Sequence, residues 1–320
     1  MSASENGINR RQLLRTLGLA ATGAAIVGAV PDLAGLAAIP AQMQAGGKAF
    51  PVTTINHLAL AVADTTKSRD FYVDLLGMRV RWDDGKRPDV EFGSMTSPNE
   101  LYIGPLAKPG DPPTVGHIAF GISNFWAQRT AIKAEMDRLG QTVRPDGEGG
   151  WTTATPTGYM VQVVPEEDDT MFPGAASPCV VAKSDKCKTA YEAGLKNLSS
   201  APKPSGNGFK AVGFSRIVLH VPNVAKDVGF FRDFLGMRVL SNKPDECLLK
   251  FGANTLDLVP TSNPDDKPYC VQYGFAIENF DSAKVEAELK RRGITLQMDP
   301  KWPVAFKDPD GLVIGISDKA

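Results

Sequence analysis

Residues 57–80 read HLALAVADTTKSRDFYVDLLGMRV, and residues 216–239 read RIVLHVPNVAKDVGFFRDFLGMRV. Each copy begins with alternating apolar residues, which are typical of a strand with one buried face. The alternation ends at Asp64 or Asn223, residue types that favour the first position of a helix. Each helical stretch then ends in LGMRV, whose glycine suits the left-handed residue after a helix. The chain therefore repeats a strand–helix–strand unit.

A second pair of similar segments follows the first. GHIAFGISNF at 116–125 matches VQYGFAIENF at 271–280, and each precedes a helical pattern. The chain thus contains four similar units, which lie near residues 53–104, 114–165, 212–260 and 270–317. Between the second and third units runs a segment rich in Pro, Gly, Ser and charge, which is typical of a linker. Because one unit cannot bury both faces of a small sheet, we expect two modules of two units each.

The N-terminal residues carry a different pattern. Arg10–Arg11 precede a weakly apolar run rich in Ala and Gly that ends before Pro31. This resembles a twin-arginine export signal, and the run is short for a membrane span, which needs about 20 residues. An uncleaved N-terminal anchor is the alternative. We expect residues 1–45 to be a signal segment and leader, with no stable membrane insertion after processing, and the mature protein to be periplasmic or extracellular.

The composition narrows the classes of partner. The formal net charge is −1, from 35 basic and 36 acidic residues, so electrostatic capture of nucleic acid is not expected. In an oxidising compartment the four cysteines could form two disulfides, in any of three pairings, for example Cys179–Cys187 with Cys247–Cys270. No two cysteines have CxxC spacing, which argues against a zinc or redox cysteine site.

The repeated unit and the pattern H-x-A-L-x-V, followed by S-x-x-F-Y-x-x-L-L-G-M, resemble the vicinal oxygen chelate superfamily. This superfamily includes glyoxalase I, extradiol ring-cleaving dioxygenases, and fosfomycin or bleomycin resistance proteins. The resemblance covers about residues 52–165 and 212–318. It implies an α+β protein of two tandem modules, each with paired βαβββ units that form a curved, mixed eight-stranded sheet with helices outside. We place these modules at residues 50–166 and 211–320, with a linker at 167–210.

The resemblance also implies a metal site on the first and last strands of each unit. In the first module these positions carry His57, Glu100, His117 and Gln162. Two imidazoles and one or two oxygens suit Fe²⁺, Mn²⁺, Ni²⁺, Co²⁺ or Zn²⁺. Relatives have a glutamate where this chain has Gln162, so one carboxylate is missing from the pattern. The alternative is that His57 is a hydrogen-bonded core residue of its apolar strand.

The second module departs from the metal pattern. Its corresponding positions read Arg216, Asp257, Gln272 and Gly315, so we expect no metal there. Arg216 and His220 lie four residues apart on one strand and therefore share a face. They either bind an anionic group or Arg216 pairs with Asp257. Tyr102 and Tyr159 are further candidates for contact with a substrate.

The export pattern and the superfamily resemblance together imply an exported, metal-dependent enzyme that acts on a small oxygen-rich molecule held by two neighbouring oxygens, as a lyase, isomerase or ring-cleaving dioxygenase. Glu100 is the candidate proton acceptor, because the amide of Gln162 cannot take a proton. The alternative function is a non-catalytic, resistance-type protein that binds a small molecule without metal. Either protein would be a monomer or a homodimer.

Overall fold

The structure is a computed structural model that describes residues 48–94, 98–146, 149–166, 192 and 194–318. The first module contains β1 (Val52–Val62), α2 (Thr65–Leu76), β2 (Arg79–Asp83), β3 (Pro88–Gly93), β4 (Pro98–Pro105), β5 (Thr114–Ile122), α3 (Phe125–Arg138), β6 (Arg144–Pro145), β7 (Trp151–Ala154) and β8 (Met160–Pro165). The second contains β9 (Ala211–Val221), α6 (Val224–Gly229), η3 (Phe230–Phe234), β10 (Arg238–Lys243), β11 (Glu246–Phe251), β12 (Asn254–Pro260), β13 (Tyr269–Ile277), α7 (Ser282–Arg291), β14 (Leu296–Gln297), β15 (Val304–Lys307) and β16 (Val313–Ser317). A short 3-10 helix, η2 (Asn197–Ser200), precedes it.

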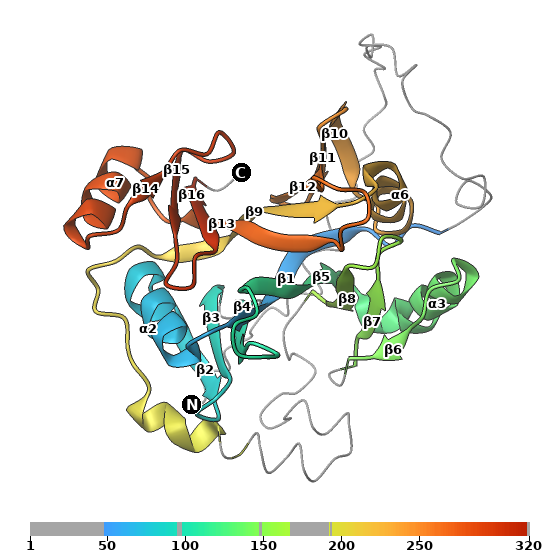
Figure 1. Cartoon of the computed structure of the whole chain (residues 1–320). Coiled ribbons are helices and arrows are strands. Elements are labelled where there is room, and N and C mark those ends of the chain that lie inside the picture. Colours follow the sequence, from blue (N-terminus) through green and yellow to red (C-terminus); the bar gives the residue numbers. More distant parts are fainter. Residues whose placement is uncertain (1–47, 95–97, 147–148, 167–191, 193, 319–320) are drawn as a thin grey trace, which may run out of the picture. The chain divides into compact units, whose positions relative to one another are not determined.

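Each module is one eight-stranded mixed sheet (Figure 1). The strand order is β2-β3-β4-β1-β5-β8-β7-β6 in the first sheet and β10-β11-β12-β9-β13-β16-β15-β14 in the second. Within a unit the first and last strands pair in parallel, as β1 does with β4. The two units of a sheet join through antiparallel pairing of their first strands, β1 with β5 and β9 with β13. This confirms the predicted α+β fold of two tandem modules, and it keeps the four predicted metal positions in one sheet.

The helix after the first strand begins and ends as its sequence predicts. The side chain of Asp64 accepts a hydrogen bond from Lys67 N, and Gly77 adopts a φ of 65°. A side chain at Gly77 would also meet the carbonyl oxygen of Phe209 at 2.7 Å, so both conformation and space require glycine. In the second module Asn223 caps α6 in the same way, and Gly236 has a φ of 64°.

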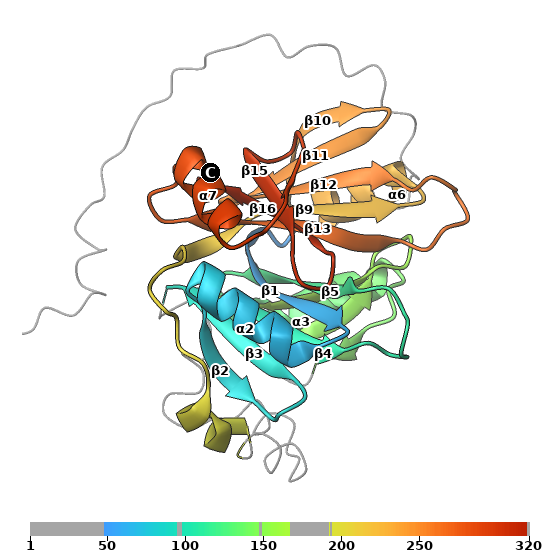
Figure 2. The same ribbon diagram turned by 60° about the vertical axis from the view of Figure 1, so that its left-hand side comes forward.

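The second copy of this helix differs from the first in its last turn. After α6 the chain continues as the π-helical turn η3, in which Leu235 N donates to Phe230 O at 3.3 Å. This bond spans five residues, one more than in an α-helix, and it widens the turn. Three aromatic side chains of η3, Phe230, Phe231 and Phe234, are thereby buried together. Figure 2 shows α2 and α7 beside the strands of their own modules.

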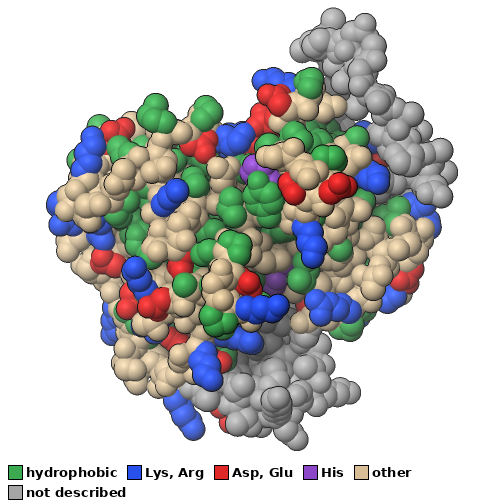
Figure 3. Space-filling model, viewed as in Figure 1, with side chains coloured by type: hydrophobic (Ala, Val, Ile, Leu, Met, Phe, Trp, Pro, Cys, Tyr) green, Lys and Arg blue, Asp and Glu red, His purple; other side chains and the backbone are tan. Residues whose placement is uncertain are grey.

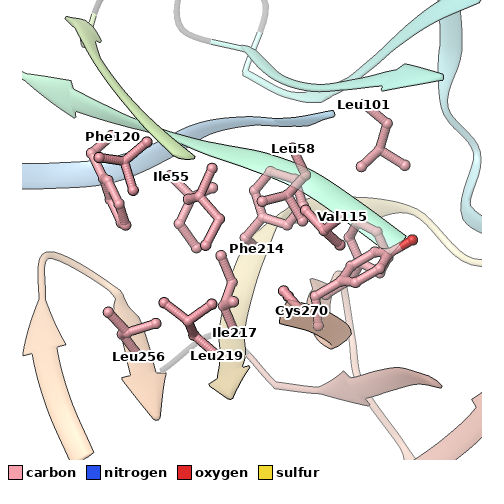
Figure 4. Close-up of a cluster of buried hydrophobic side chains, with 14 of the residues drawn as sticks. Ile55, Leu58, Leu101, Val115, Phe120, Phe214, Ile217, Leu219, Leu256 and Cys270 are labelled. Carbon is pink, nitrogen blue, oxygen red and sulfur yellow. The ribbon is translucent and has the colours of Figure 1, made fainter. Parts of the chain in front are cut away.

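The hydrophobic core lies on one face of each sheet. Along β1, Leu58, Leu60 and Val62 are buried, and the corresponding residues of β9 are buried as well. Side chains from both sheets meet in a single cluster (Figure 4). Phe92 contacts Phe214 across it, with ring centroids 5.0 Å apart. Because alternate residues of a strand point to opposite faces, His57 and Ala59 lie on the face away from this core.

Two equivalent turns, one from each module, contact a helix of the other module, and the acidic side chain lies on opposite partners in the two contacts. In the first contact the turn at Asp308–Gly311 meets the start of α2, where Asp310 accepts hydrogen bonds from Ala63 N (2.9 Å) and from the hydroxyl of Ser68. In the second the equivalent turn at 155–158 meets α6, where Asp227 accepts from Thr157 N (3.1 Å) and the Thr157 hydroxyl (2.5 Å). The acid therefore lies on the turn in one contact and on the helix in the other.

The structure tests the predictions about the cysteines and the N-terminal segment only in part. Cys247 and Cys270 are buried free thiols, so the suggested disulfide between them is wrong. They lie on different strands of the second sheet, and burial raises their pKa values to about 11 and about 12. The signal segment, Cys179 and Cys187 lie outside the described residues. Among the residues that are described, no helix is long and apolar enough to cross a membrane.

Candidate metal centre

The face of the first sheet that points away from the shared core, called the outward face below, brings five of the predicted side chains into one region. Strand pairing places Glu100 beside His57, and Tyr102 beside Ala59. Antiparallel pairing then places His117 opposite Ala59 as well. Gln162 lies next to Ala119, which is itself the partner of His57. Residues from β1, β4, β5 and β8 thus converge because both units belong to one sheet.

The two imidazoles are in direct contact. The Nε2 atoms of His57 and His117 lie 3.1 Å apart, and the ring planes cross at 78°. His57 is only 1% exposed, and its Nδ1 lies 2.9 Å from the side-chain oxygen of Asn56. The ring of Tyr102 stacks on His57, with centroids 4.2 Å apart. His57 is therefore held in place from three sides.

Burial makes both imidazoles weak bases. The pKa of His57 is well below its usual value because of desolvation, and His117 and Arg81 lower it further, while a hydrogen bond with Gln162 opposes the shift. The pKa of His117 falls to about 4, first through burial and then through the charge of Arg144. Near neutral pH both rings are neutral, so their nitrogen lone pairs are available to a metal.

Gln162 presents an oxygen to the imidazole pair. Its Nε2 atom donates to the hydroxyl of Thr152 at 3.3 Å, and the carboxamide raises the pKa of His57, as an oxygen acceptor beside the ring does. The described part of this region thus offers two imidazole nitrogens and one amide oxygen.

Glu100 is oriented differently. It is 3% exposed, and its Oε1 atom forms an ion pair with Arg81 of β2. Within the described ranges, no three side chains of His, Cys, Asp and Glu are grouped so that they could hold one ion. The structure therefore brings His57, His117 and Gln162 together and leaves Glu100 with a guanidinium partner.

The nitrogen pair fits a divalent metal. Two imidazole nitrogens bound to one ion at about 2.1 Å each must lie less than about 4.2 Å apart. The 3.1 Å between the Nε2 atoms of His57 and His117 meets this limit. Neutral imidazoles and an amide oxygen suit Mn²⁺, Fe²⁺ or Zn²⁺, although the set lacks the carboxylate of a two-histidine–one-carboxylate iron site.

The equivalent face of the second sheet is filled by its own side chains. Trp302 lies against Gly274 and Gly315, and it forms a small cluster with Val218 and Ala305. Gly315 is the counterpart of Gln162, so the missing side chain there makes space for the indole ring.

In the space-filling view histidine is visible at two places on the face shown, between charged and hydrophobic side chains (Figure 3).

Arg216 is fully engaged within this second face. Its Nε and Nη2 atoms donate to Asp257 at 2.5 and 3.0 Å, and its Nη1 atom donates to the carbonyl oxygen of Lys301 at 2.9 Å.

The alignment of Asp257 with Glu100 was wrong by two residues. The strand register pairs Thr255 with Arg216, as Glu100 pairs with His57, so Thr255 is the true counterpart.

The other predicted substrate contacts lie apart from one another. Tyr102 is at the imidazole pair, as described above. Tyr159 is buried, and its hydroxyl donates to the carbonyl oxygen of Val115 at 2.7 Å. His220 belongs to the second sheet, where it stacks on Tyr269 with centroids 4.6 Å apart. Only Tyr102 of these residues contacts His57 in the described structure.

Sequence reasoning missed two residues of these faces. Arg81 lies on an outer strand, and no motif connects it with Glu100, which is two strands away in the sheet. Trp302 precedes β15 and carries no pattern of its own. The glycines at 274 and 315 were an available signal, because small residues at two adjacent strand positions leave space for a large side chain.

The paired βαβββ sheets give this chain the vicinal oxygen chelate fold. Residues 54–163 match the family model of the Glyoxalase/Bleomycin resistance protein/Dioxygenase superfamily. No curated protein sequence shows significant similarity to the chain.

Solved structures with the same fold include enzymes of two kinds. The 2,3-dioxygenase LapB from Pseudomonas sp. KL28 is 15% identical, with a TM-score of 0.61 over 84% of this chain and 93% of its own. The Mn(II)-bound glyoxalase from Novosphingobium aromaticivorans is 18% identical, with a TM-score of 0.60 over 84% and 83%. Homoprotocatechuate 2,3-dioxygenase from Arthrobacter globiformis is 17% identical, with a TM-score of 0.61 over 85% and 81%. At these identities the similarity establishes the fold.

Proposed function

We propose that the first module binds a divalent metal and that the protein is a metal-dependent enzyme acting on a small molecule with two neighbouring oxygens. The observation that carries this proposal is the contact between the Nε2 atoms of His57 and His117, at 3.1 Å, with both rings neutral near pH 7. Two neutral imidazoles held this close on one sheet face are suited to share an ion.

Each side chain has a distinct part in this proposal. His57 and His117 hold the ion, and the amide oxygen of Gln162 is the third ligand. Tyr102 covers the ring of His57 and excludes water from that side. When bound, the metal would act as a Lewis acid that polarises a substrate oxygen. Glu100 is the nearest carboxylate by strand register and is the candidate proton acceptor.

The ligand set favours one type of reaction. Activation of O₂ by iron typically uses two histidines and a carboxylate, whereas here the third position is an amide and Glu100 is paired with Arg81. Proton transfer next to a polarised oxygen requires no redox-active metal. We therefore favour a lyase or isomerase of the glyoxalase type over a ring-cleaving dioxygenase.

The test is a titration of the full chain with Mn²⁺, and then with Zn²⁺, Fe²⁺, Ni²⁺ and Co²⁺, followed by isothermal calorimetry and elemental analysis. We expect one equivalent of metal in the wild type and at least a tenfold weaker affinity in His57→Gln and His117→Gln. His220→Gln is the matched control, because it removes the remaining histidine from the second sheet. A wild-type chain that takes up no metal, or an equal loss in His220→Gln, would contradict the proposal.

A second candidate is a binding protein without metal, and the Arg81–Glu100 ion pair is the observation that favours it. In that case the outward face of the first sheet would hold a small molecule by hydrogen bonds and by stacking on Tyr102. The two functions differ in their response to a chelator. Ligand binding that is unchanged by EDTA in wild type and in His117→Gln would favour the metal-free binder.

Export remains part of the proposal. Arg10–Arg11 and the apolar run after them carry it, and they lie outside the described residues. Replacement of both arginines by lysine is expected to leave the precursor unprocessed in the cytoplasm. Processing that is unaffected by this change would exclude a twin-arginine signal.

A further inference from the structure

The ion pair between Arg81 and Glu100 belongs to a row of polar side chains that runs across the first sheet from the imidazole pair to β2. Glu100 is the strand partner of His57, and Glu91 is the strand partner of Glu100. Each acid has its own arginine from β2. Arg79 donates to Glu91 at 3.1 Å, and Arg81 pairs with Glu100. Two carboxylates side by side would repel, and the two arginines remove this repulsion.

We propose that Arg81 is a positioning residue that keeps the Glu100 carboxylate from coordinating the metal and thereby sets the affinity of the metal centre for divalent ions. This inference rests on the proposed function of the first module. It goes beyond that function because it assigns a role to a residue that is neither a ligand nor in contact with the substrate.

Burial strengthens the electrostatic interaction between Arg81 and Glu100. The side chain of Glu100 is 4% exposed and that of Arg81 is 23% exposed, so water screens their charges poorly. A guanidinium on a buried carboxylate cancels the negative charge that would attract a cation. The second oxygen of Glu100 gains little affinity for a cation, because the positive charge of Arg81 also repels a divalent ion directly.

The Arg79–Glu91 pair provides an internal comparison. It has the same chemistry and its arginine lies on the same strand, β2, but its acid lies on β3, which is one strand further from His57 than the β4 strand of Glu100. Arg79 is also more exposed, at 40% of its side chain. Loss of Arg79 should therefore leave the metal centre unchanged, whereas loss of Arg81 should free the carboxylate beside it.

The experiment is Mn²⁺ binding to the full chain, measured by calorimetry and by the electron paramagnetic resonance signal of free Mn²⁺. Arg81→Met is expected to bind Mn²⁺ at least tenfold more tightly than wild type. Arg81→Lys, which keeps the charge, and Arg79→Met, the matched control, should stay within about threefold of wild type. Arg81→Gln serves as a smaller change in case Arg81→Met does not fold.

A second set of variants shows whether Glu100 is responsible. Glu100→Gln in the wild-type background should change Mn²⁺ affinity by less than threefold, because Arg81 already withholds this carboxylate. In the Arg81→Met background the same substitution should abolish the gain. A strictly structural role for Arg81 would alter thermal stability without this dependence on Glu100.

The outcomes separate this inference from the proposed function. If wild type binds Mn²⁺ and Arg81→Met binds it no more tightly, the inference is wrong and the metal centre stands. A large loss of affinity in Glu100→Gln alone would also overturn the inference, because Glu100 would then be a ligand despite Arg81. If neither wild type nor any Arg81 variant binds Mn²⁺, both proposals fail.

Discussion

The indole ring of Trp302 lies directly against Gly315 on the outward face of the second sheet. Gly315 occupies the position that Gln162 occupies in the first sheet. The site that one module presents around two imidazoles is therefore filled by a tryptophan in the other. The second module therefore has the strand order of the first, but a tryptophan takes the space that the ligand side chains take there.

A side chain at residue 315 should disturb this packing. A Cβ atom on Gly315 would overlap the indole ring of Trp302, and rigid rings in a filled site cannot yield. We expect Gly315→Ala to lower the free energy of unfolding by about 1–3 kcal/mol, the usual cost of overpacking. Urea denaturation followed by fluorescence would measure it. The control is Gly104→Ala, where the nearest atom, Leu60 O, lies at an ordinary 3.6 Å; equal effects would argue against the packing explanation.

Because the acid lies on the turn in one turn–helix contact and on the helix in the other, moving the acid of the second contact from helix to turn should restore the stability that each single substitution removes. Thr157→Asp would place a second carboxylate against buried Asp227 and should destabilise the chain by about 3 kcal/mol or more. Asp227→Ser alone removes the acceptor for three hydrogen bonds. The double variant rebuilds the arrangement seen between Asp310 and Ser68, so it should recover most of the loss. A double-mutant cycle in urea tests this, and costs that simply add would contradict it.

Local features of this fold could be predicted from the sequence because short-range chemistry decides them. Asp64 caps a helix and Gly77 ends it through contacts within a few residues. The His57–His117 contact followed from the resemblance to the vicinal oxygen chelate superfamily, which implied that both histidines lie on first strands of paired units. Glu100 was placed correctly on its strand, but its partner was not foreseen. Arg81 reaches it only through the register of three strands, which short sequence patterns do not encode.

A buried hydrogen-bond chain between the modules should contribute measurably to stability. The hydroxyl of Tyr72 donates to Asp308 Oδ2 at 2.6 Å and lies 2.6 Å from the hydroxyl of Tyr273. Tyr72→Phe would leave a buried carboxylate oxygen with one donor fewer. We expect a loss of about 1–3 kcal/mol in the free energy of unfolding, measured by urea denaturation. Tyr269→Phe, at a 37% exposed ring, should change it by less than about 0.5 kcal/mol.

The imidazole pair predicts a pH dependence of stability with a definite sign. The pKa of His117 falls to about 4 on folding, and that of His57 is also well below its usual value. Between pH 6.5 and 4 the unfolded chain therefore binds more protons at these residues than the folded chain does. Their contribution to stability is fully present above about pH 6.5 and is lost as the pH falls toward 4.

The measurement is the free energy of unfolding in urea at pH 7.5 and pH 5, with a chelator present. Asp227 acts in the opposite direction. Burial raises its pKa to about 6, so its contribution to the stability of the folded chain falls as the pH rises toward 6. Only the difference between variants isolates the histidines. Wild type should lose about 1–2 kcal/mol per imidazole more than His57→Gln/His117→Gln does between these pH values. The same loss in both proteins would mean that the two rings are not buried together in the neutral form, and the basis for a metal centre there would be removed.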